Sequence, residues 1–319
     1  MLQQWGVRSM SASPAAVVVE DLHVAYGSTW ALGGVDLETT RGTTLGVLGH
    51  NGAGKTTLIR VLTTLLRPSA GRVTVGGFDV VADADQVRRI IGVTGQYAGL
   101  DEFLTGRENL ELIGRLTGLG QGARHRAGDL IDRLDLGDLA GRRVGQLSGG
   151  SRRRIDLAAS LVGSPSVLFL DEPTTGLDPT ARAGLWNVVA ELTAGGTTVV
   201  LTTQYLDEAD RLADHIVVLD HGRVAARGTP VELKRLVGGK VVTATIASTD
   251  VDRLPDRPDL ERSAGPGEVT VTFSTGDADG AAALVARLTR AGVEATDLEV
   301  TSPSLDDVFA HLTLTGAQS

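Results

Sequence analysis

The sequence predicts an α/β fold built around a parallel sheet, followed by a small α+β domain. A glycine-rich loop stands between an apolar strand and an apolar helix, and a later apolar run ends in two acids. A long helical stretch between them has almost no strand signal, which predicts a helical subdomain inserted into the core. We place a disordered leader at 1–15, the large domain at 16–236, its helical insertion at about 97–165 and the last domain at 240–319.

Composition excludes several kinds of protein. The formal charge of −9 argues against a nucleic-acid partner, because affinity for phosphate backbones comes from clustered lysine and arginine. The chain has no cysteine, which excludes disulfides and cysteine metal sites. No apolar run approaches the ~18–20 residues of a membrane span, and residues 1–16 lack the apolar core of a signal peptide, so we expect a cytoplasmic protein. The leader is polar and aperiodic, and Met10 is an alternative start.

The first strands precede the glycine-rich loop. Residues 17–22 and 37–47 have strand character, and the second of these runs is interrupted at 41–43. Tyr26 lies between them, where an aromatic ring is available to stack on a nucleotide base. The alternative is that Tyr26 is an ordinary core or surface residue.

Residues 49–57 read Gly-His-Asn-Gly-Ala-Gly-Lys-Thr-Thr and fit the phosphate-loop pattern G-x-x-x-x-G-K-[ST]. Backbone N–H groups at such a strand-to-helix turn form an anion-binding nest, to which the helix N-terminus adds partial positive charge. We expect Lys55 to reach the terminal phosphates and the Thr56 hydroxyl to ligate Mg²⁺, while Gly52 and Gly54 allow close backbone approach. An ordinary glycine-rich turn is the alternative. The candidate nucleotide-binding residues of this loop are Gly49, Asn51, Gly52, Ala53, Gly54, Lys55, Thr56 and Thr57.

A helix with one buried face is predicted directly after the loop, and a stop signal at 67–71 ends it. A short strand follows at 72–77, and a further strand is predicted to end at Gln96. The apolar positions assigned to the buried helix face are Leu58, Ile59, Val61, Leu62, Leu65 and Leu66.

Residues 105–164 show helical periodicity, and the segment Leu147-Ser148-Gly149-Gly150-Ser151 stands near their end. Ser148 is a good N-cap and the two glycines free the backbone, so we predict a second helix start that can receive an anion. The alternative is a capped helix followed by a solvated arginine run at 152–154.

Residues 167–173 form a continuous apolar run that ends in Asp171 and Glu172, as expected for a strand buried on both faces. Carboxylates at the end of a parallel strand lie in the ligand crevice of a doubly wound sheet. We predict that Asp171 holds Mg²⁺ through water and that Glu172 polarises an attacking water. Taken alone, the pair fits a helix cap equally well.

Three further elements follow the acidic pair. Asp178 lies in a turn before an apolar helix, and a strand at 197–203 ends at Gln204. Residues 215–227 are predicted to form a hairpin that turns at His221-Gly222.

The last domain shows a different pattern, with strands predicted at 240–247, 268–274 and 293–301 and a helix at 281–291. A final helix is predicted to start at Ser302-Pro303. Its buried positions would be Leu305, Val308, Phe309 and Leu312. His311 with Asp306 and Asp307 could form a metal site, but a solvated helix face fits them better. We interpret this domain as a structural one, for dimer or subunit contacts.

Together these residues resemble the nucleotide-binding subunits of ATP-binding-cassette (ABC) transporters over roughly residues 17–229. Residues 49–57 look like the Walker A motif of that family, 147–151 like its signature motif and 167–172 like its Walker B motif with the catalytic glutamate. The resemblance implies a P-loop ABC cassette that binds and hydrolyses ATP with Mg²⁺.

The resemblance extends to shorter elements. Gln96 looks like the Q-loop glutamine, which contacts the metal, 176–178 looks like the D-loop, and Tyr26 stands where the family stacks adenine. The run around the signature, residues 202–210 and the ending 304–309 look like the daunorubicin-resistance-type drug-efflux ATPases. Members of that type act with a separate multi-span membrane permease at the cytoplasmic face of the membrane.

The family's dimer gives these motifs their expected roles. Two cassettes sandwich two ATP molecules, so Ser148, Gly149, Gly150 and Ser151, with Asp178, would act on the nucleotide bound to a second copy of the chain. ATP binding would close the dimer, and hydrolysis would reopen it. The closure would reach the permease through Gln96 and the helical segment.

The sequence departs from the family pattern at two positions. Ser151 stands where the signature usually has glutamine, and Gln204 stands where most members have a switch histidine. A glutamine amide can donate a hydrogen bond but carries no proton or positive charge. We predict that the protein hydrolyses ATP and that Gln204 acts only as a sensor of the γ-phosphate.

Two rival functions remain at this stage. A soluble cassette ATPase acting on DNA or ribosomes would carry a long coiled-coil insertion or a second cassette, and this acidic chain has neither. A P-loop kinase or GTPase would have no use for residues 147–151. We therefore favour an ATPase subunit that couples hydrolysis to export of a drug-like or hydrophobic compound.

Overall fold

The computed structural model describes residues 15–95, 99–236, 241–254, 259–261, 268–274, 278–301 and 304–309. Within the chain, two compact units are distinguished, Met1–Thr229 and Pro230–Ser319, and each is described by itself. Ala15 already belongs to the first strand. The predictions for residues 1–14, Gln96, Ser302, Pro303, His311 and Leu312 lie outside the described residues.

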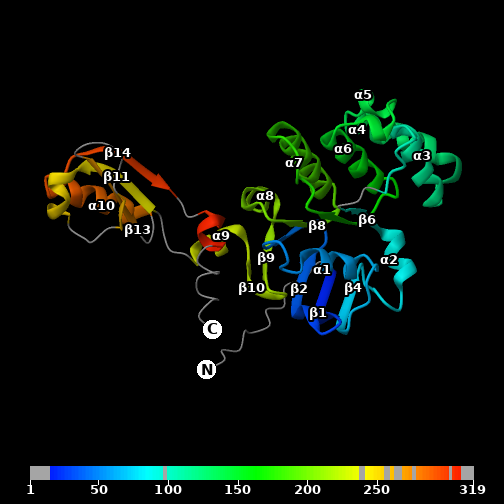
Figure 1. Ribbon diagram of the computed structural model, residues 1–319, viewed down its shortest axis with the longest axis horizontal. Coiled ribbons are helices and arrows are strands. Elements are labelled where there is room, and N and C mark those ends of the chain that lie inside the picture. Colours follow the sequence, from blue (N-terminus) through cyan, green and yellow to red (C-terminus); the bar gives the residue numbers. More distant parts are fainter. Residues whose placement is uncertain are drawn as a thin grey trace. The chain divides into compact units, whose positions relative to one another are not determined.

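The first unit is centred on a six-stranded sheet with the order β10-β9-β3-β8-β7-β6 (Figure 1). All neighbours are parallel except β9 and β10, which form the predicted hairpin. Every residue of β3, β7 and β8 is buried, as their apolar sequences predicted. The strands are β3 (Thr44–Leu48), β6 (Ile91–Thr94), β7 (Val167–Asp171), β8 (Thr198–Thr203), β9 (His215–Asp220) and β10 (Arg223–Gly228).

A second, antiparallel sheet has the order β2-β1-β4-β5. Helix α1 (Lys55–Leu62) packs its apolar face into the same core as this sheet and the central strands. The predicted face is wrong at Leu65, which is 72% exposed, because α1 ends at Leu62 and Thr64 takes a left-handed φ of 64°. The strands are β1 (Ala15–Tyr26), β2 (Thr29–Thr40), β4 (Ala70–Val75) and β5 (Phe78–Asp79).

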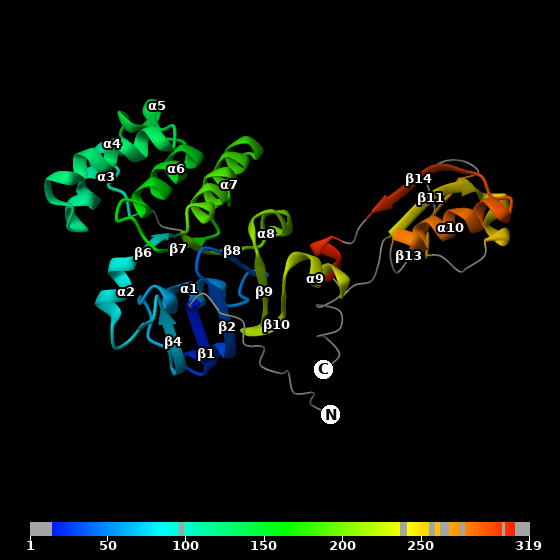
Figure 2. The same cartoon turned by 180° about the vertical axis from the view of Figure 1, so that it is seen from behind.

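The predicted helical insertion is confirmed: α3 to α6 lie between β6 and β7 in the chain and form one group of helices next to these strands (Figure 2). Thr105 and Glu108 form a capping box that starts α3. Short 3₁₀ turns at Gly120–Gly122 and Val144–Gln146 link the helices. The helices of this unit besides α1 are α2 (Ala84–Ile90), α3 (Gly106–Leu116), α4 (Ala123–Arg133), α5 (Gly137–Ala140), α6 (Gly149–Ser160), α7 (Pro179–Ala194) and α8 (Leu206–Leu212).

The second unit contains an antiparallel sheet with the order β12-β13-β11-β14. Residues Ala244, Ile246, Val271, Phe273, Leu288 and Val293 form its core. Sequence reasoning missed α9 and β12, which are short. The elements are α9 (Pro230–Arg235), β11 (Val241–Ala247), β12 (Asp259–Glu261), β13 (Glu268–Ser274), α10 (Ala278–Arg290) and β14 (Ala295–Thr301), with a 3₁₀ turn at Ser248–Arg253.

The end of this unit agrees with the predicted amphipathic pattern. Leu305 and Val308 are buried, while Asp306 and Asp307 are exposed. Asp307 Oδ2 accepts hydrogen bonds of 2.8 Å from both the backbone N–H and the hydroxyl of Ser304. This carboxylate therefore forms part of a helix cap, in line with the solvated helix face predicted for Asp306 and Asp307.

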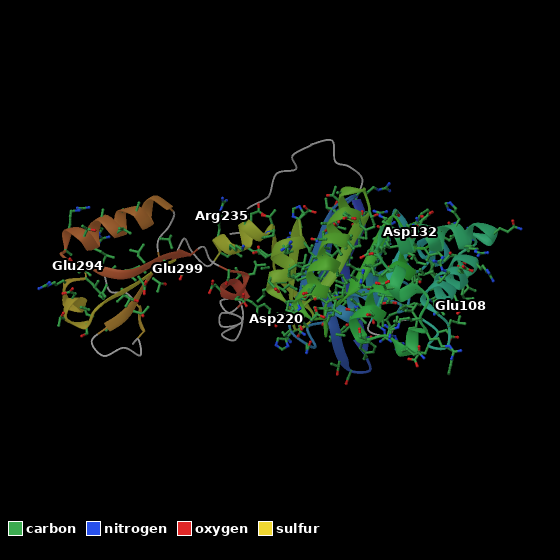
Figure 3. All side chains as sticks on the ribbon, turned by 90° about the horizontal axis from the view of Figure 1, so that it is seen from above. Glu108, Asp132, Asp220, Arg235, Glu294 and Glu299 are labelled. Carbon is green, nitrogen blue, oxygen red and sulfur yellow. The ribbon has the colours of Figure 1, made fainter. Side chains whose placement is uncertain are left out.

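Acidic side chains lie at the surface of both units. Glu108 and Asp132 on the first unit, and Glu294 and Glu299 on the second, are exposed; all four are labelled in Figure 3. In the part of the chain that the structure describes, no helix has the length and apolar character to cross a membrane.

Candidate functional site

The carboxyl ends of three neighbouring strands bring the phosphate loop beside the two acids. In the parallel register, Leu48 at the end of β3 pairs with Thr203 of β8, and Thr202 pairs with Asp171 of β7. The loop after β3, Glu172 after β7 and Gln204 after β8 therefore leave the sheet at one edge. This is the ligand-binding edge of an open α/β sheet.

Glycines shape the phosphate loop in different ways. Gly52 and Gly54 have φ values of 87° and 106°, which residues with a Cβ rarely adopt. An added Cβ at Gly54 would also lie 2.6 Å from Leu32 Cδ2, whereas no atom lies within 4 Å of one at Gly52. At Gly49 a Cβ would lie 2.5 Å from the Leu219 carbonyl oxygen of β9. Sequence reasoning missed this packing role of Gly49, because its neighbour lies far along the chain.

Lys55 is almost fully buried, at 4% exposure, and its ammonium group has three close partners. Nζ donates to the backbone oxygens of Gly49, at 2.7 Å, and His50, at 3.1 Å. It also lies 3.3 Å from Glu172 Oε1, so the loop lysine and the second acid form an ion pair. The side chain of Glu172 is 11% exposed, which leaves it little solvent to screen the pair.

Two hydroxyls converge on one oxygen of Asp171. Thr202 Oγ1 donates to Asp171 Oδ1 at 2.6 Å, and Thr56 Oγ1 lies 3.4 Å from the same atom. The two residues predicted to hold Mg²⁺, Thr56 and Asp171, are thus brought together. Thr202 also receives the backbone N–H of Glu172, on both its carbonyl oxygen and its hydroxyl, at 3.1 Å. Sequence reasoning missed Thr202, although a threonine at the end of an apolar strand is a detectable signal.

The signature residues form a separate group. The Ser148 hydroxyl caps α6 by accepting from Ser151 N at 3.2 Å, and the two hydroxyls lie 3.0 Å apart. Asp178 caps α7 by accepting from Ala181 N at 2.9 Å. Ser148, Gly150, Ser151 and Asp178 line one cavity of about 750 Å³, whose walls come from α6, α7 and the end of α4 rather than from the phosphate loop.

Tyr26 and Gln96 are two further predicted site residues. Tyr26 ends β1 and is 45% exposed, so its ring is accessible to a ligand. Gln96 follows the last described residue of its segment, Gly95, and is outside the described part of the chain.

The arginines after the signature are not a solvated run. Arg153 donates to the backbone oxygens of Asp171 at 2.9 Å, Glu172 at 3.1 Å and Pro173 at 3.1 Å, and also to that of Gly95. Arg153 therefore ties α6 to the end of β7, directly at the acidic pair.

The neighbouring arginines serve other contacts. Arg154 donates to the backbone oxygens of Leu134 and Asp135, and Arg152 pairs with Glu102 at 2.9 Å. These bonds stay within the helical insertion and its entry segment.

We expect Arg153→Ala to lower the free energy of unfolding by about 3 kcal/mol or more, because several backbone carbonyls lose a charged donor. Arg154→Ala, which removes bonds to only two carbonyls, is the matched control and should cost less. Denaturant unfolding of both variants measures the difference. Equal losses would show that the bonds of Arg153 between α6 and β7 stabilise the fold no more than the bonds of Arg154 do.

Asp156 is a buried acid on the same helix. Its Oδ2 atom lacks a hydrogen-bond partner and lies 3.7 Å from Arg153 Nη1. Burial raises the pKa of Asp156 from 3.8 to about 6, while the Arg153 charge acts in the opposite direction. The folded chain therefore binds this proton more tightly than the unfolded chain.

That raised pKa predicts a pH dependence of stability. The contribution of Asp156 is fully present below about pH 4 and is lost as the pH rises to about 6, at about 1.4 kcal/mol per pH unit. Asp156→Asn should remove this slope and be more stable than the wild type at pH 7. Denaturant unfolding of both proteins at several pH values measures it, and a variant that is less stable at pH 7 would contradict the prediction.

Comparisons with known proteins decide the family. The profile described as ABC transporter matches residues 32–175, and the one described as the C-terminal domain of ATP-binding protein DrrA1-3-like matches residues 228–313. The chain is 52% identical over 307 residues to the daunorubicin resistance ATP-binding protein DrrA3 of Streptomyces coeruleorubidus, covering 93% of this chain and 96% of that protein. This chain belongs to the ABC transporter family.

Further similar proteins support the assignment of this ABC subunit to the family. It is 36% identical to the Nod factor export ATP-binding protein I of Rhizobium sp. (strain N33), over 94% of this chain and 98% of the relative. The ATP-binding cassette MJ0796, in a dimeric post-hydrolysis state bound to ADP and Pi, matches with a TM-score of 0.61 at 27% identity, over 67% of this chain and 98% of that one.

These likenesses place the ABC subunit with the daunorubicin-resistance-type ATP-binding subunits. The predicted cassette fold with a C-terminal α+β domain is confirmed. The chain is an ATPase, the energy-supplying subunit of an ABC transporter. Family members form dimers and act with membrane subunits at the cytoplasmic face.

Proposed function

We propose that this subunit binds ATP with Mg²⁺ and drives export of a drug-like or hydrophobic compound through a separate multi-span permease. The contact of Lys55 and Thr56 with the acidic pair carries the catalytic part of the proposal. The relatives named for daunorubicin resistance and Nod factor export support an exporter. The test is expression with a permease encoded beside its gene: export should need both chains, whereas association with ribosomes or nucleic acid would favour the alternative.

The proposed roles follow from the side-chain chemistry. Thr56 and Asp171 would hold Mg²⁺, together with Gln96, because hydroxyl and carboxylate oxygens are the ligands this hard cation prefers. The ion would neutralise charge on the transferred phosphoryl group. Glu172 would accept a proton from the attacking water, and Lys55 would bind the phosphates. Tyr26 would stack on adenine.

A second copy of the chain would complete the site. Ser148 and Gly149 are exposed at the start of α6, where they can reach a nucleotide on another chain. The helix N-terminus adds backbone N–H donors there. Asp178, at the same cavity, would line the contact between the two copies.

The helical insertion offers a surface for the permease. Phe103 and Leu116 are 82% and 77% exposed, and Leu112 and Leu119 are also exposed. Leu112 and Leu116 are four residues apart on α3 and share one face of that helix, and neighbouring exposed apolar side chains are a common feature of contact surfaces. Leu116→Glu should reduce co-purification of the permease and leave ATP binding intact. Leu65→Glu, which changes an exposed leucine outside the insertion, is the matched control; equal loss from both would contradict this placement.

We expect Gln204→Ala to slow ATP turnover about tenfold, because a single hydrogen bond to the γ-phosphate is worth about 1–1.5 kcal/mol. ADP affinity should not change, since ADP lacks that phosphate. Steady-state phosphate release and binding of both nucleotides measure the two effects. If turnover and ATP affinity both stay at wild-type values, Gln204 is not a sensor.

A further inference from the structure

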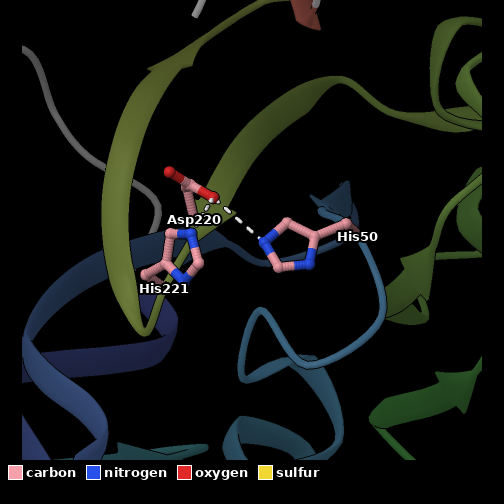
Figure 4. Close-up of side chains that lie close together, drawn as sticks. All are labelled: His50, Asp220 and His221. Carbon is pink, nitrogen blue, oxygen red and sulfur yellow. Dashed lines mark hydrogen bonds and ion pairs between the residues drawn. The ribbon is translucent and has the colours of Figure 1, made fainter. Parts of the chain in front are cut away.

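Three metal-binding side chains meet where the β9–β10 turn lies against the phosphate loop (Figure 4). His50 belongs to the loop, Asp220 ends β9, and His221 begins the turn. Asp220 Oδ1 lies 3.0 Å from Nε2 of His50 and 3.8 Å from Nε2 of His221, and the three donor atoms are all within 4.8 Å of one another. We propose that this cluster binds one divalent transition-metal ion of the zinc class, separate from the Mg²⁺ that accompanies ATP.

The hydrogen bonding of His50 orients its Nε2 atom toward Asp220, as a metal ligand would be oriented. Its Nδ1 lies 2.7 Å from the backbone oxygen of Asn51, which can only accept, so Nδ1 carries the proton. In the neutral ring Nε2 then presents a lone pair, and this lone pair faces the Asp220 carboxylate. Either a proton on Nε2, which makes an ion pair with Asp220, or a bound metal ion can bridge these two atoms at 3.0 Å. A histidine that donates its other N–H to a backbone carbonyl is the usual arrangement of a metal ligand.

The spacing and the donor types select the ion. Zinc bonds of about 2.0–2.1 Å in tetrahedral geometry place neighbouring ligand atoms about 3.3 Å apart, and the two distances from Asp220 bracket this value. Two imidazoles and one carboxylate suit Zn²⁺, Co²⁺ or Ni²⁺, whereas Mg²⁺ prefers oxygen ligands. His221 is 85% exposed, so solvent reaches the cluster and a water can take the remaining coordination position.

The scaffold holds the ligands in place. Gly222 in the turn donates its backbone N–H to the Ala53 oxygen of the phosphate loop at 3.0 Å. The backbone oxygen of His50 accepts from both Ala53 N and Lys55 Nζ. An ion at this cluster would therefore link the β9–β10 turn to a residue that also contacts the phosphate-loop lysine.

Titration of the full-length, untagged protein with Co²⁺ tests the proposal, with excess Mg²⁺ and no nucleotide present. Visible absorption should show one tetrahedrally coordinated Co²⁺ per chain, and Zn²⁺ should displace it. His221→Ala and Asp220→Asn should each weaken Co²⁺ binding at least about tenfold, since even loss of an outer partner of a metal ligand costs that much.

His125→Ala is the matched control. His125 makes a similar ion pair with Asp129, at 3.0 Å, but among the described residues it belongs to no group of three possible metal ligands. It should keep wild-type Co²⁺ affinity. Thermal melting without metal checks that all variants are folded. The proposal is overturned if the wild type shows no saturable binding in the presence of Mg²⁺, or if folded His221→Ala and Asp220→Asn bind Co²⁺ as the wild type does. In either case His50 and Asp220 form only an ion pair.

Discussion

Glu172→Gln is expected to abolish ATP turnover, keep ATP binding and trap a dimer of the chain. The amide has the shape of the carboxylate but cannot accept a proton, and loss of a general base costs about 10²–10⁴-fold in rate. ATP would then close two chains around the nucleotide without reopening them. The variant also loses the 3.3 Å ion pair with Lys55, so ATP affinity should not fall.

The experiment combines phosphate release, ATP binding and size-exclusion chromatography with ATP present. Glu38→Gln changes an exposed acid on β2 and serves as the control, with wild-type turnover. A Glu172→Gln protein that remains monomeric and turns over ATP at the wild-type rate would refute both the proposed base and the proposed sandwich dimer.

Lys55→Ala should reduce ATP affinity by about tenfold to a hundredfold, since each charge-assisted hydrogen bond is worth about 1.5–3 kcal/mol. The variant would lose the proposed phosphate contact as well as the two bonds that Nζ donates within the loop. It also leaves Glu172, with little exposure, without its cation. Equilibrium binding of a fluorescent ATP analogue measures the loss.

Lys234→Ala is the control for Lys55, because the chain has only three lysines and Lys234 lies in the second unit. Lys55→Arg separates charge from shape: the guanidinium keeps the charge but does not fit a site built for a compact ammonium. Unchanged ATP affinity in Lys55→Ala would remove the lysine from the proposed phosphate site.

Much of the cassette core could be predicted because its signals are local. The apolar run of β7 and the glycine-rich loop before α1 each contain their own pattern, and both elements form as expected. The end of α1 was predicted wrongly at Leu65, since periodicity cannot show that Thr64 leaves the helical conformation. The short strand β12 gave no periodic signal.

The site was predictable to a similar extent. Motif spacing selected Lys55, Asp171 and Glu172 as candidates, and the structure places them at one edge of the sheet, but their partners depend on tertiary packing. Thr202 and Arg153 contact the acidic pair from elements separated from it in sequence, and no spacing rule joins them to it. The same reason hides the cluster at His50, whose partners come from the β9–β10 turn.

The ion pair between Lys55 and Glu172 suggests that the carboxylate is kept from acting as a base until nucleotide binds. The lysine proposed to bind phosphate and the acid proposed to polarise water hold each other, and one ammonium group cannot serve both partners at full strength. A phosphate group that attracts Lys55 would free the Glu172 carboxylate only when ATP is bound and can be hydrolysed. In this arrangement, binding of each ATP molecule would itself release the base that hydrolyses it.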